Sequence, residues 1–161
     1  MGVGGTPASF SRAGRLGLPL FIAMLSGPAR FRRLVELYRE SAAAAGHDAG
    51  ALPVGAGGHF YAAPLLPCLL RAKHATPRGS LPPFHLRFLD RTGGGLLVGS
   101  PQQLTEKLLE IHQSLGNTRY LAQVGLGGLP FAETARSIEL LATEILPAVN
   151  REIRPAGVGA A

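Results

Sequence analysis

Cysteine is nearly absent from this sequence, and its scarcity limits how the chain can be stabilised. Cys68 is the only cysteine among the 161 residues. No disulfide can therefore form within the chain, and a zinc site built on cysteines is not expected. So little use of cysteine is typical of a reducing compartment, and we expect a cytoplasmic protein.

Long apolar runs are also missing. No stretch reaches the roughly 18 to 20 consecutive apolar residues that a membrane-spanning helix needs. The first residues, 1–12, are small and polar and lack the basic-then-apolar order of a signal peptide. These absences predict a soluble protein with no membrane partner.

Several kinds of functional site lack their sequence signals. The 16 lysines and arginines outnumber the 10 acidic residues, giving a net charge of +6, but they are scattered without interleaved aromatic residues. We therefore expect no nucleic-acid binding. We expect no metal site either, because ligand-like spacing is missing from the histidines His47, His74, His85 and His112. No Gly-x-Ser-x-Gly nucleophile pattern occurs, and the sequence does not identify a catalytic residue.

The composition is that of a packed domain with many turns. Apolar residues make up 46% of the chain, the mean hydropathy is +0.19, and there are 22 glycines and 13 prolines. The length fits a single domain, which we place at residues 1–154, followed by a disordered tail at 155–161.

The first half predicts a strand, a helix and a second strand. Residues 17–25 (GLPLFIAML) are apolar on both faces, which is typical of a buried parallel strand. Residues 28–46 predict an amphipathic helix with proline in its first turn and glycine at its C-terminal end, and its apolar residues are Phe31, Leu34, Val35, Tyr38 and Ala42. Residues 52–63 predict the second strand, which completes a βαβ unit.

The second half resumes this order after an irregular, proline-rich insertion at about 64–93. Ser100 predicts the N-cap of a helix whose apolar stripe is Leu104, Leu108, Ile111 and Leu115. Residues 118–125 predict a third strand. Residues 132–153 predict a long helix, kinked by Pro147 near Leu146, with Ile138, Leu141, Ile145 and Val149 on its apolar face. We expect solvated helix faces to carry the glutamates Glu106, Glu110, Glu133, Glu139 and Glu144.

The N-terminal segment GVGGTPASFSRAG could form a phosphate-binding turn. Val3 would end a strand, and Gly4 and Gly5 would let backbone N–H groups approach an anion. A helix beginning near Pro7 would direct its positive end to the same place. An ordinary turn followed by an N-cap explains the same residues equally simply. A second glycine turn, Ser26-Gly27, follows the next predicted strand.

The order of these segments resembles the C-terminal half of the luciferase-like monooxygenases, which are flavin-dependent (β/α)8-barrel oxidoreductases. The motifs that carry the resemblance are GVGGTPASFSRAGRLGLPLFIAML, GSPQQ with the helix after it, and RYLAQVGLGGLP. The resemblance implies an α/β fold, a partial TIM-type barrel in which Val3 ends strand five and the three predicted strands are strands six to eight.

The same resemblance implies a cofactor and an activity. Reduced FMN, or a deazaflavin in its place, would lie across the C-terminal mouth of the barrel. Its phosphate would be held by Gly4, Gly5 and Thr6, and by Ser26 and Gly27. His59 and Tyr61 could face that mouth, with a structural role as the alternative for His59. The implied reaction is that of a monooxygenase or oxidoreductase that acts on a small organic substrate with oxygen and is supplied by a flavin reductase.

Two departures from the family pattern bear on these expectations. A whole barrel needs roughly 250 residues, so strands one to four are missing, and residues 64–93 fit the family poorly. We therefore expect part of a longer or split enzyme, with marginal stability or association into a homo-oligomer through its open sheet edges. The alternative is a catalytically inactive half-barrel remnant or a self-associating interaction module.

Overall fold

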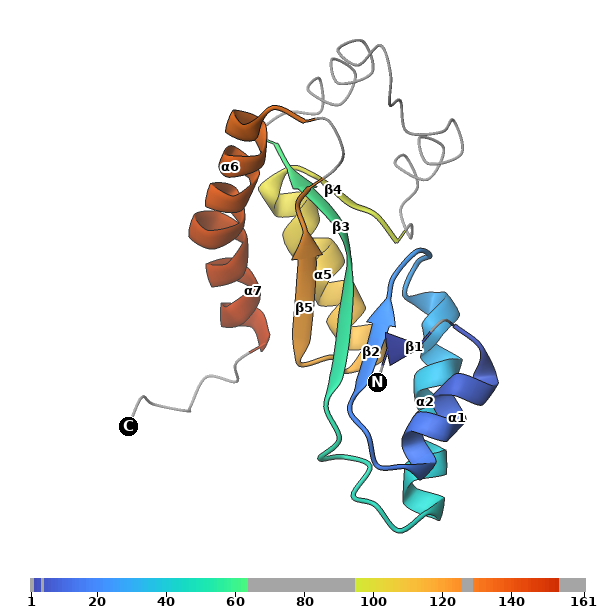
Figure 1. Ribbon diagram of the computed structural model, residues 1–161. Helices are drawn as coiled ribbons and strands as arrows, with labels where there is room; N and C mark the ends of the chain where they lie inside the picture. The colour runs from blue at the N-terminus through green and yellow to red at the C-terminus, as the bar shows by residue number, and fades with distance from the viewer. Residues whose placement is uncertain (1, 4, 64–94, 126–128, 154–161) are drawn as a thin grey trace.

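The computed structural model describes residues 2–3, 5–63, 95–125 and 129–153, coloured from blue to red in Figure 1. The irregular insertion and the disordered tail expected from the sequence lie outside these ranges. The elements of the first half are β1 (Gly2–Val3), α1 (Pro7–Arg15), β2 (Leu20–Ala23), α2 (Ala29–Ala44) and β3 (Val54–Ala62). Those of the second half are β4 (Leu97–Gly99), α5 (Pro101–Leu115), β5 (Arg119–Gln123), α6 (Phe131–Leu140), the π-helical turn η1 (Leu141–Ile145) and α7 (Leu146–Ile153).

The described strands form one sheet in which every pairing is parallel. The order is β1-β2-β3, with β5 on the other side of β3. Val3 lies opposite Ile22, Ile22 opposite Ala56, and Ala56 opposite Tyr120. The parallel α/β fold expected from the sequence is confirmed. The sequence did not predict β4, a short strand that pairs with the last residues of β3.

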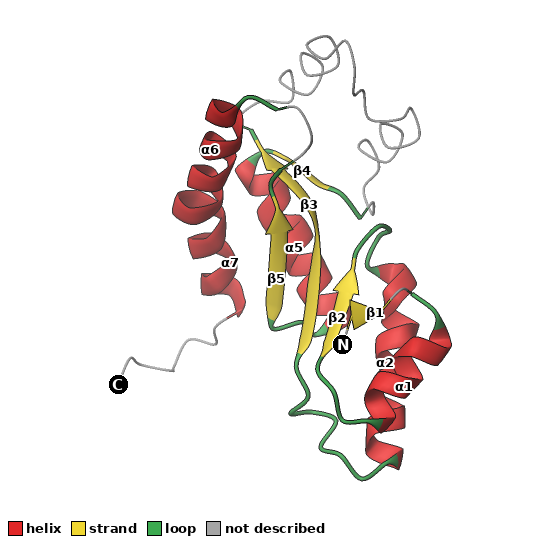
Figure 2. Ribbon diagram, viewed as in Figure 1, coloured by secondary structure: helices red, strands yellow, loops and turns green. Residues whose placement is uncertain are grey.

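The two faces of this sheet have different surroundings. Helices lie on one side, as Figure 2 shows, and the strand residues directed to them are buried in the core, among them Leu20, Ile22, Val54, Ala56 and Phe60. Alternate residues point to the opposite face. There Ala23 is exposed and Leu121 keeps 62% of its surface accessible. One face of the sheet therefore forms the core, and the other carries no helix among the described residues.

Helix α2 follows the sequence prediction closely. Phe31, Val35, Tyr38 and Ala42 are buried, and the Tyr38 hydroxyl donates a hydrogen bond of 2.8 Å to the Leu18 carbonyl. Gly46 follows the last helical turn with a φ of +83°, a conformation that L-residues rarely adopt and that commonly ends helices. The periodic apolar stripe and the terminal glycine therefore located this helix correctly.

The long C-terminal helix differs from its prediction in one respect. The expected kink at Pro147 is replaced by the π-helical turn η1, and Leu146 keeps helical angles (φ −60°, ψ −43°). A π turn accommodates one extra residue, which shifts the apolar face. The buried residues are accordingly Leu140, Ile145 and Val149, whereas Ile138 is 47% exposed. The expected place of Ile138 on the apolar face is wrong for this reason.

Candidate functional site

The carboxyl ends of β1 and β2 bring two glycine turns together. In a parallel sheet these ends share one edge, where ligands commonly bind. Gly5 belongs to the turn after β1, and a Cβ added there would lie 3.8 Å from Cε1 of Phe31 in the first turn of α2. The turn Ser26-Gly27 leads into the same helix. Both turns therefore follow strands that end at the same edge of the sheet; Gly4 lies outside the described residues.

The turn after β1 contains a glycine in the left-handed region and leads into an uncapped helix. Gly5 has a φ of +84°, which favours glycine because other residues are strained there. Thr6 is the extended N-cap of α1 and Pro7 its first residue, but no side chain caps the helix. The Thr6 hydroxyl instead donates to Oγ of Ser9 (3.1 Å). No acidic residue lies in the first turn, so the positive end of the helix dipole is not neutralised there.

The turn after β2 is fixed by close backbone packing. A Cβ added at Gly95 would lie 2.5 Å from the backbone nitrogen of Ser26, so only glycine allows this approach. The Gly27 carbonyl accepts a hydrogen bond of 3.2 Å from the Arg30 N–H. The first turn of α2 also lacks acidic residues and adds the exposed cationic side chain of Arg30. The sequence analysis did not single out Arg30 as a site residue. Its position two residues after Pro28, in the expected first turn of the helix, could have indicated it.

His59 lies on the face of the sheet that carries no helix among the described residues. His59 lies opposite Gln123 of β5. It is two residues after Gly57, and a Cβ added at Gly57 would meet Cζ of Phe21 and Cβ of Leu121 on the same face. Its Nδ1 is buried and has no hydrogen-bond partner among the described residues. A buried, unsatisfied ring nitrogen is costly. The position is therefore suited to a polar ligand group that would satisfy the nitrogen.

Tyr61 has a different role from the one expected for it. Its ring is buried with Ala63 and Val98 in a small cluster beside β4, and its hydroxyl donates a hydrogen bond of 2.9 Å to Oε2 of Glu133 on α6. The expectation that Glu133 lies on a solvated face is therefore wrong. The tertiary fold brings a strand residue and a helix residue 72 positions apart into contact, which local periodicity does not reveal.

Tyr120 also carries a buried hydroxyl without a hydrogen-bond partner among the described residues. It packs against the core on the helix side of the sheet, near Gly58, where an added Cβ would lie 3.3 Å from the hydroxyl. Burial raises the pKa of Tyr120 well above its usual value because it disfavours the phenolate. Tyr120 is therefore a neutral tyrosine packed against the core.

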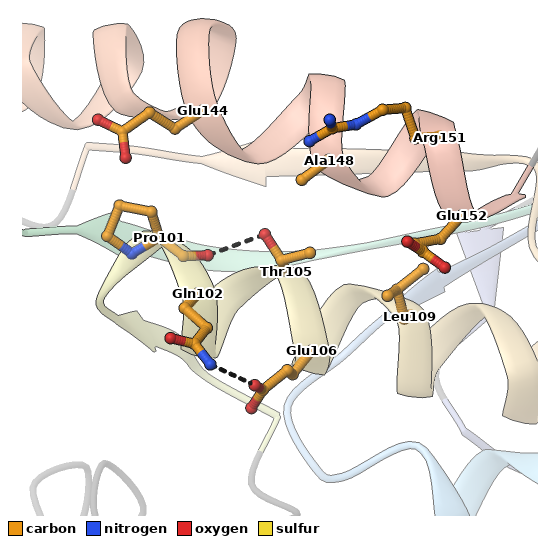
Figure 3. Close-up of a pocket in the computed structure, with 9 residues that line it drawn as sticks. All are labelled: Pro101, Gln102, Thr105, Glu106, Leu109, Glu144, Ala148, Arg151 and Glu152. Carbon is orange, nitrogen blue, oxygen red and sulfur yellow. Dashed lines mark hydrogen bonds between the residues drawn. The ribbon is translucent and has the colours of Figure 1, made fainter.

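A separate groove of about 400 Å³ lies in the helical layer between α5 and α7. Figure 3 shows its lining: Pro101, Gln102, Thr105, Glu106, Leu109, Glu144, Ala148, Arg151 and Glu152. Thr105 donates to the Pro101 carbonyl, and Gln102 donates to Glu106. Within the described ranges, no cluster of three His, Cys, Asp or Glu residues could hold a metal ion. This groove is distinct from the edge where the glycine turns meet.

The fold and the position of the turns define a parallel β/α protein of barrel type. The family model for luciferase-like monooxygenases matches residues 1–64. This match agrees with the resemblance found in the sequence and covers the first 64 of the 161 residues. No protein of curated function gives a significant sequence match.

Solved structures extend the likeness over most of the chain. Monooxygenase RslO1 from Streptomyces bottropensis is 25% identical with a TM-score of 0.66, and the match covers 91% of this chain and 46% of that one. The oxygenating constituent of 3,6-diketocamphane monooxygenase from Pseudomonas putida, in complex with FMN, is 22% identical with a TM-score of 0.60. That match covers 88% of this chain and 45% of the monooxygenase chain.

The coenzyme F420-dependent tetrahydromethanopterin reductase from Methanopyrus kandleri is 17% identical with a TM-score of 0.63, over 91% of this chain and 49% of the reductase. The chain thus spans about half the length of the solved structures it matches. This agrees with the partial barrel expected from the sequence. None of the helices in the described ranges has the length and apolar character needed to cross a membrane.

Proposed function

We propose that this chain carries the cofactor-phosphate part of a flavin-dependent oxidoreductase of the luciferase-like monooxygenase type. The observation that carries the proposal is the meeting of the Gly5 turn with the first turn of α2 at the carboxyl ends of parallel strands. Two helix N-termini without acidic residues converge there. Such an arrangement favours a phosphate dianion.

The residues present fit a flavin phosphate. Gly5, Thr6 and Gly27 offer backbone N–H groups, Thr6 and Ser26 offer hydroxyls, and Gly4 joins them by its place in the sequence. We favour FMN over a deazaflavin as the occupant, although the solved structures with this fold include proteins of both kinds. Bound there in its reduced form, the flavin would supply the redox chemistry for oxygenation of a small organic substrate, with oxygen as the second reactant and a reductase as its source of electrons.

The chain's own residues would bind and orient the cofactor. The phosphate would anchor at the two turns, and the buried Nδ1 of His59 would exchange a hydrogen bond with a polar group of the bound molecule. Tyr61 and Glu133 would hold α6 against the end of β3. Catalysis by the complete barrel would also need the strands that the longer relatives carry and the described part of this chain does not.

The experiment compares FMN with riboflavin, which lacks the phosphate, by fluorescence titration of the purified chain. We expect micromolar binding of FMN and weaker binding of riboflavin. Gly5→Ala should weaken FMN binding at least tenfold and leave riboflavin binding nearly unchanged.

Gly46→Ala is the matched control, because Gly46 has nearly the same φ (+83° against +84°) and lies away from the turn. Each substitution places an L-residue in the left-handed region and should cost roughly 1–2 kcal/mol of stability. Equal FMN affinities in the two variants would contradict the phosphate site.

A second candidate function, self-association without turnover, is favoured by one observation. The sheet face opposite the helices exposes the apolar side chain of Leu121, and Leu25 is exposed in the bend after β2; exposed apolar side chains can mark interaction surfaces. Under this candidate the chain would be an inactive half-barrel remnant or interaction module. It would form a concentration-dependent homo-oligomer without binding flavin.

A further inference from the structure

We propose that His59 and Gln123 bind the polar edge of the flavin ring system, the pyrimidinedione in which an N–H lies between two carbonyls. FMN and the deazaflavins share this edge. The inference rests on the proposed function, because it concerns the ring of the cofactor whose phosphate the two glycine turns would hold. It adds a second, separate contact on β3 and β5.

The two side chains are neighbours at the carboxyl edge of the sheet. His59 and Gln123 are partners in the parallel register of β3 and β5, so their side chains extend to the same face from backbones about 5 Å apart. Gln123 is the last residue of β5. His59 lies two residues beyond Gly57, which is paired with Ala23 at the end of β2. The pair therefore lies at the same end of the sheet as the glycine turns.

The pair offers donors and acceptors side by side. Nδ1 of His59 is buried without a hydrogen-bond partner in the described ranges, while the imidazole as a whole is only partly buried and Gln123 is exposed. A neutral imidazole has one donor and one acceptor, and an amide has both. These groups can match a ligand edge that alternates acceptor, donor and acceptor. The contact would also satisfy a nitrogen that is costly to leave unpaired.

The surface next to the pair is apolar. A Cβ added at Gly55 or Gly57 would lie 3.1 Å or 2.8 Å from carbons of the Phe21 ring, so these glycines let that ring lie against β3. Leu121, two residues before Gln123, keeps 62% of its surface accessible. Ligand sites commonly combine an apolar lining with a few polar groups that fix the orientation. An aromatic ring system with one polar edge therefore fits this surface better than a second phosphate does.

The strand order places the pair within reach of the phosphate turns. β3 and β5 follow β1 and β2 across the sheet, so the two contacts are two strand spacings apart, roughly 10 Å. FMN has a ribityl chain between its phosphate and its ring, which suits two separate contacts. One cofactor can therefore engage both.

The test compares FMN with 3-methyl-FMN, in which a methyl group replaces the hydrogen of the ring N–H, by fluorescence titration of the purified full chain. We expect the wild type to bind FMN about tenfold more tightly, the effect of about one hydrogen bond. His59→Phe and Gln123→Met keep the side-chain size and remove the polar atoms. Each should bind the two flavins with similar affinity.

His47→Phe is the matched control. His47 precedes β3 at the amino end of that strand, and its Nε2 lies 3.1 Å from the Arg15 carbonyl oxygen. This variant should keep the wild-type preference for FMN. Circular dichroism would verify folding, and because Gln123 is exposed, Gln123→Met decides the matter if His59→Phe does not fold.

The outcomes separate this inference from the phosphate site. Equal affinities of the wild type for the two flavins, a preference retained in either folded pair variant, or a preference lost in His47→Phe would overturn the ring contact. Failure of the wild type to bind FMN would contradict both proposals. Wild-type FMN affinity in Gly5→Ala, with the preference for FMN intact, would count against the phosphate site alone.

Discussion

At the scale of single residues, a few polar side chains attach helix α6 to the carboxyl end of β3. Tyr61 donates to Glu133, and the Ala62 N–H donates to the buried hydroxyl oxygen of Ser137 at 2.8 Å. The Ser137 bond replaces a strand partner, since β5 ends opposite His59 and leaves Ala62 beyond its reach. The end of β3 is therefore held by α6 where β5 no longer reaches it, while β4 still pairs with its last residues.

Ser137→Ala should lower the free energy of unfolding by about 1–3 kcal/mol, because it leaves the N–H of Ala62 buried without an acceptor. Chemical denaturation would measure the loss. Thr143→Ala is the control: the Thr143 hydroxyl donates to a carbonyl of its own helix and is exposed, so its removal should change stability by less than about 0.5 kcal/mol. Equal losses in the two variants would contradict the bracing role of Ser137.

Tyr61→Phe should be more costly than Tyr38→Phe. The Tyr61 hydroxyl donates to a carboxylate and the Tyr38 hydroxyl to a neutral carbonyl. Hydrogen bonds to charged groups contribute about 1.5–3 kcal/mol, against about 0.5–1.5 kcal/mol for neutral pairs. Urea titration of both variants gives the comparison, and a larger loss for Tyr38→Phe would argue against an ionised Glu133 as the acceptor.

Local residue chemistry was predictable from the sequence, whereas contacts between distant residues were not. Ser100 was expected as an N-cap, and it forms a complete capping box with Gln103. Gly46 was expected at the end of α2 and has the required positive φ. The Tyr61–Glu133 bond depends on how strands and helices meet, as does the burial of His59 Nδ1, which has no hydrogen-bond partner within the described part of the chain; no short-range signal indicates either.

At the scale of secondary-structure elements, the C-terminal helix shows where helical periodicity fails. A regular period predicted one continuous apolar face, but η1 separates the buried Leu140 and Ile145 by five residues. Pro147 follows this turn and is accommodated in α7 without a break. The helical period of 3.6 residues does not indicate a π-helical turn, because the apolar pattern on each side of the turn remains helical.

Ile145→Ala should destabilise the fold by about 2–5 kcal/mol, since its fully buried side chain would leave a cavity. Ile138→Ala, three residues before η1 begins, should cost much less because Ile138 is 47% exposed. Thermal and denaturant unfolding of both variants distinguishes the π-shifted face from the regular one. Similar losses would favour the regular helix that the sequence predicted.

At the scale of the whole molecule, the alternation of strands and helices predicted the class of fold, and the parallel pairings confirm it. The matched structures are about twice as long as this chain, and one face of the sheet carries no helix among the described residues. The short strand β4 escaped prediction because it has only three residues and pairs where β2 has already ended.

The proposed phosphate site consists of the turns after β1 and β2 at the carboxyl end of the sheet. Amide chemical shifts of the isotopically labelled chain, recorded during titration with FMN and separately with riboflavin, test it most directly. We expect FMN to move the amide signals of Gly4, Gly5, Thr6, Ser26 and Gly27 most, and riboflavin to leave these five nearly unchanged. If FMN moved none of them, or moved only signals of the groove between α5 and α7, the phosphate site would be in the wrong place.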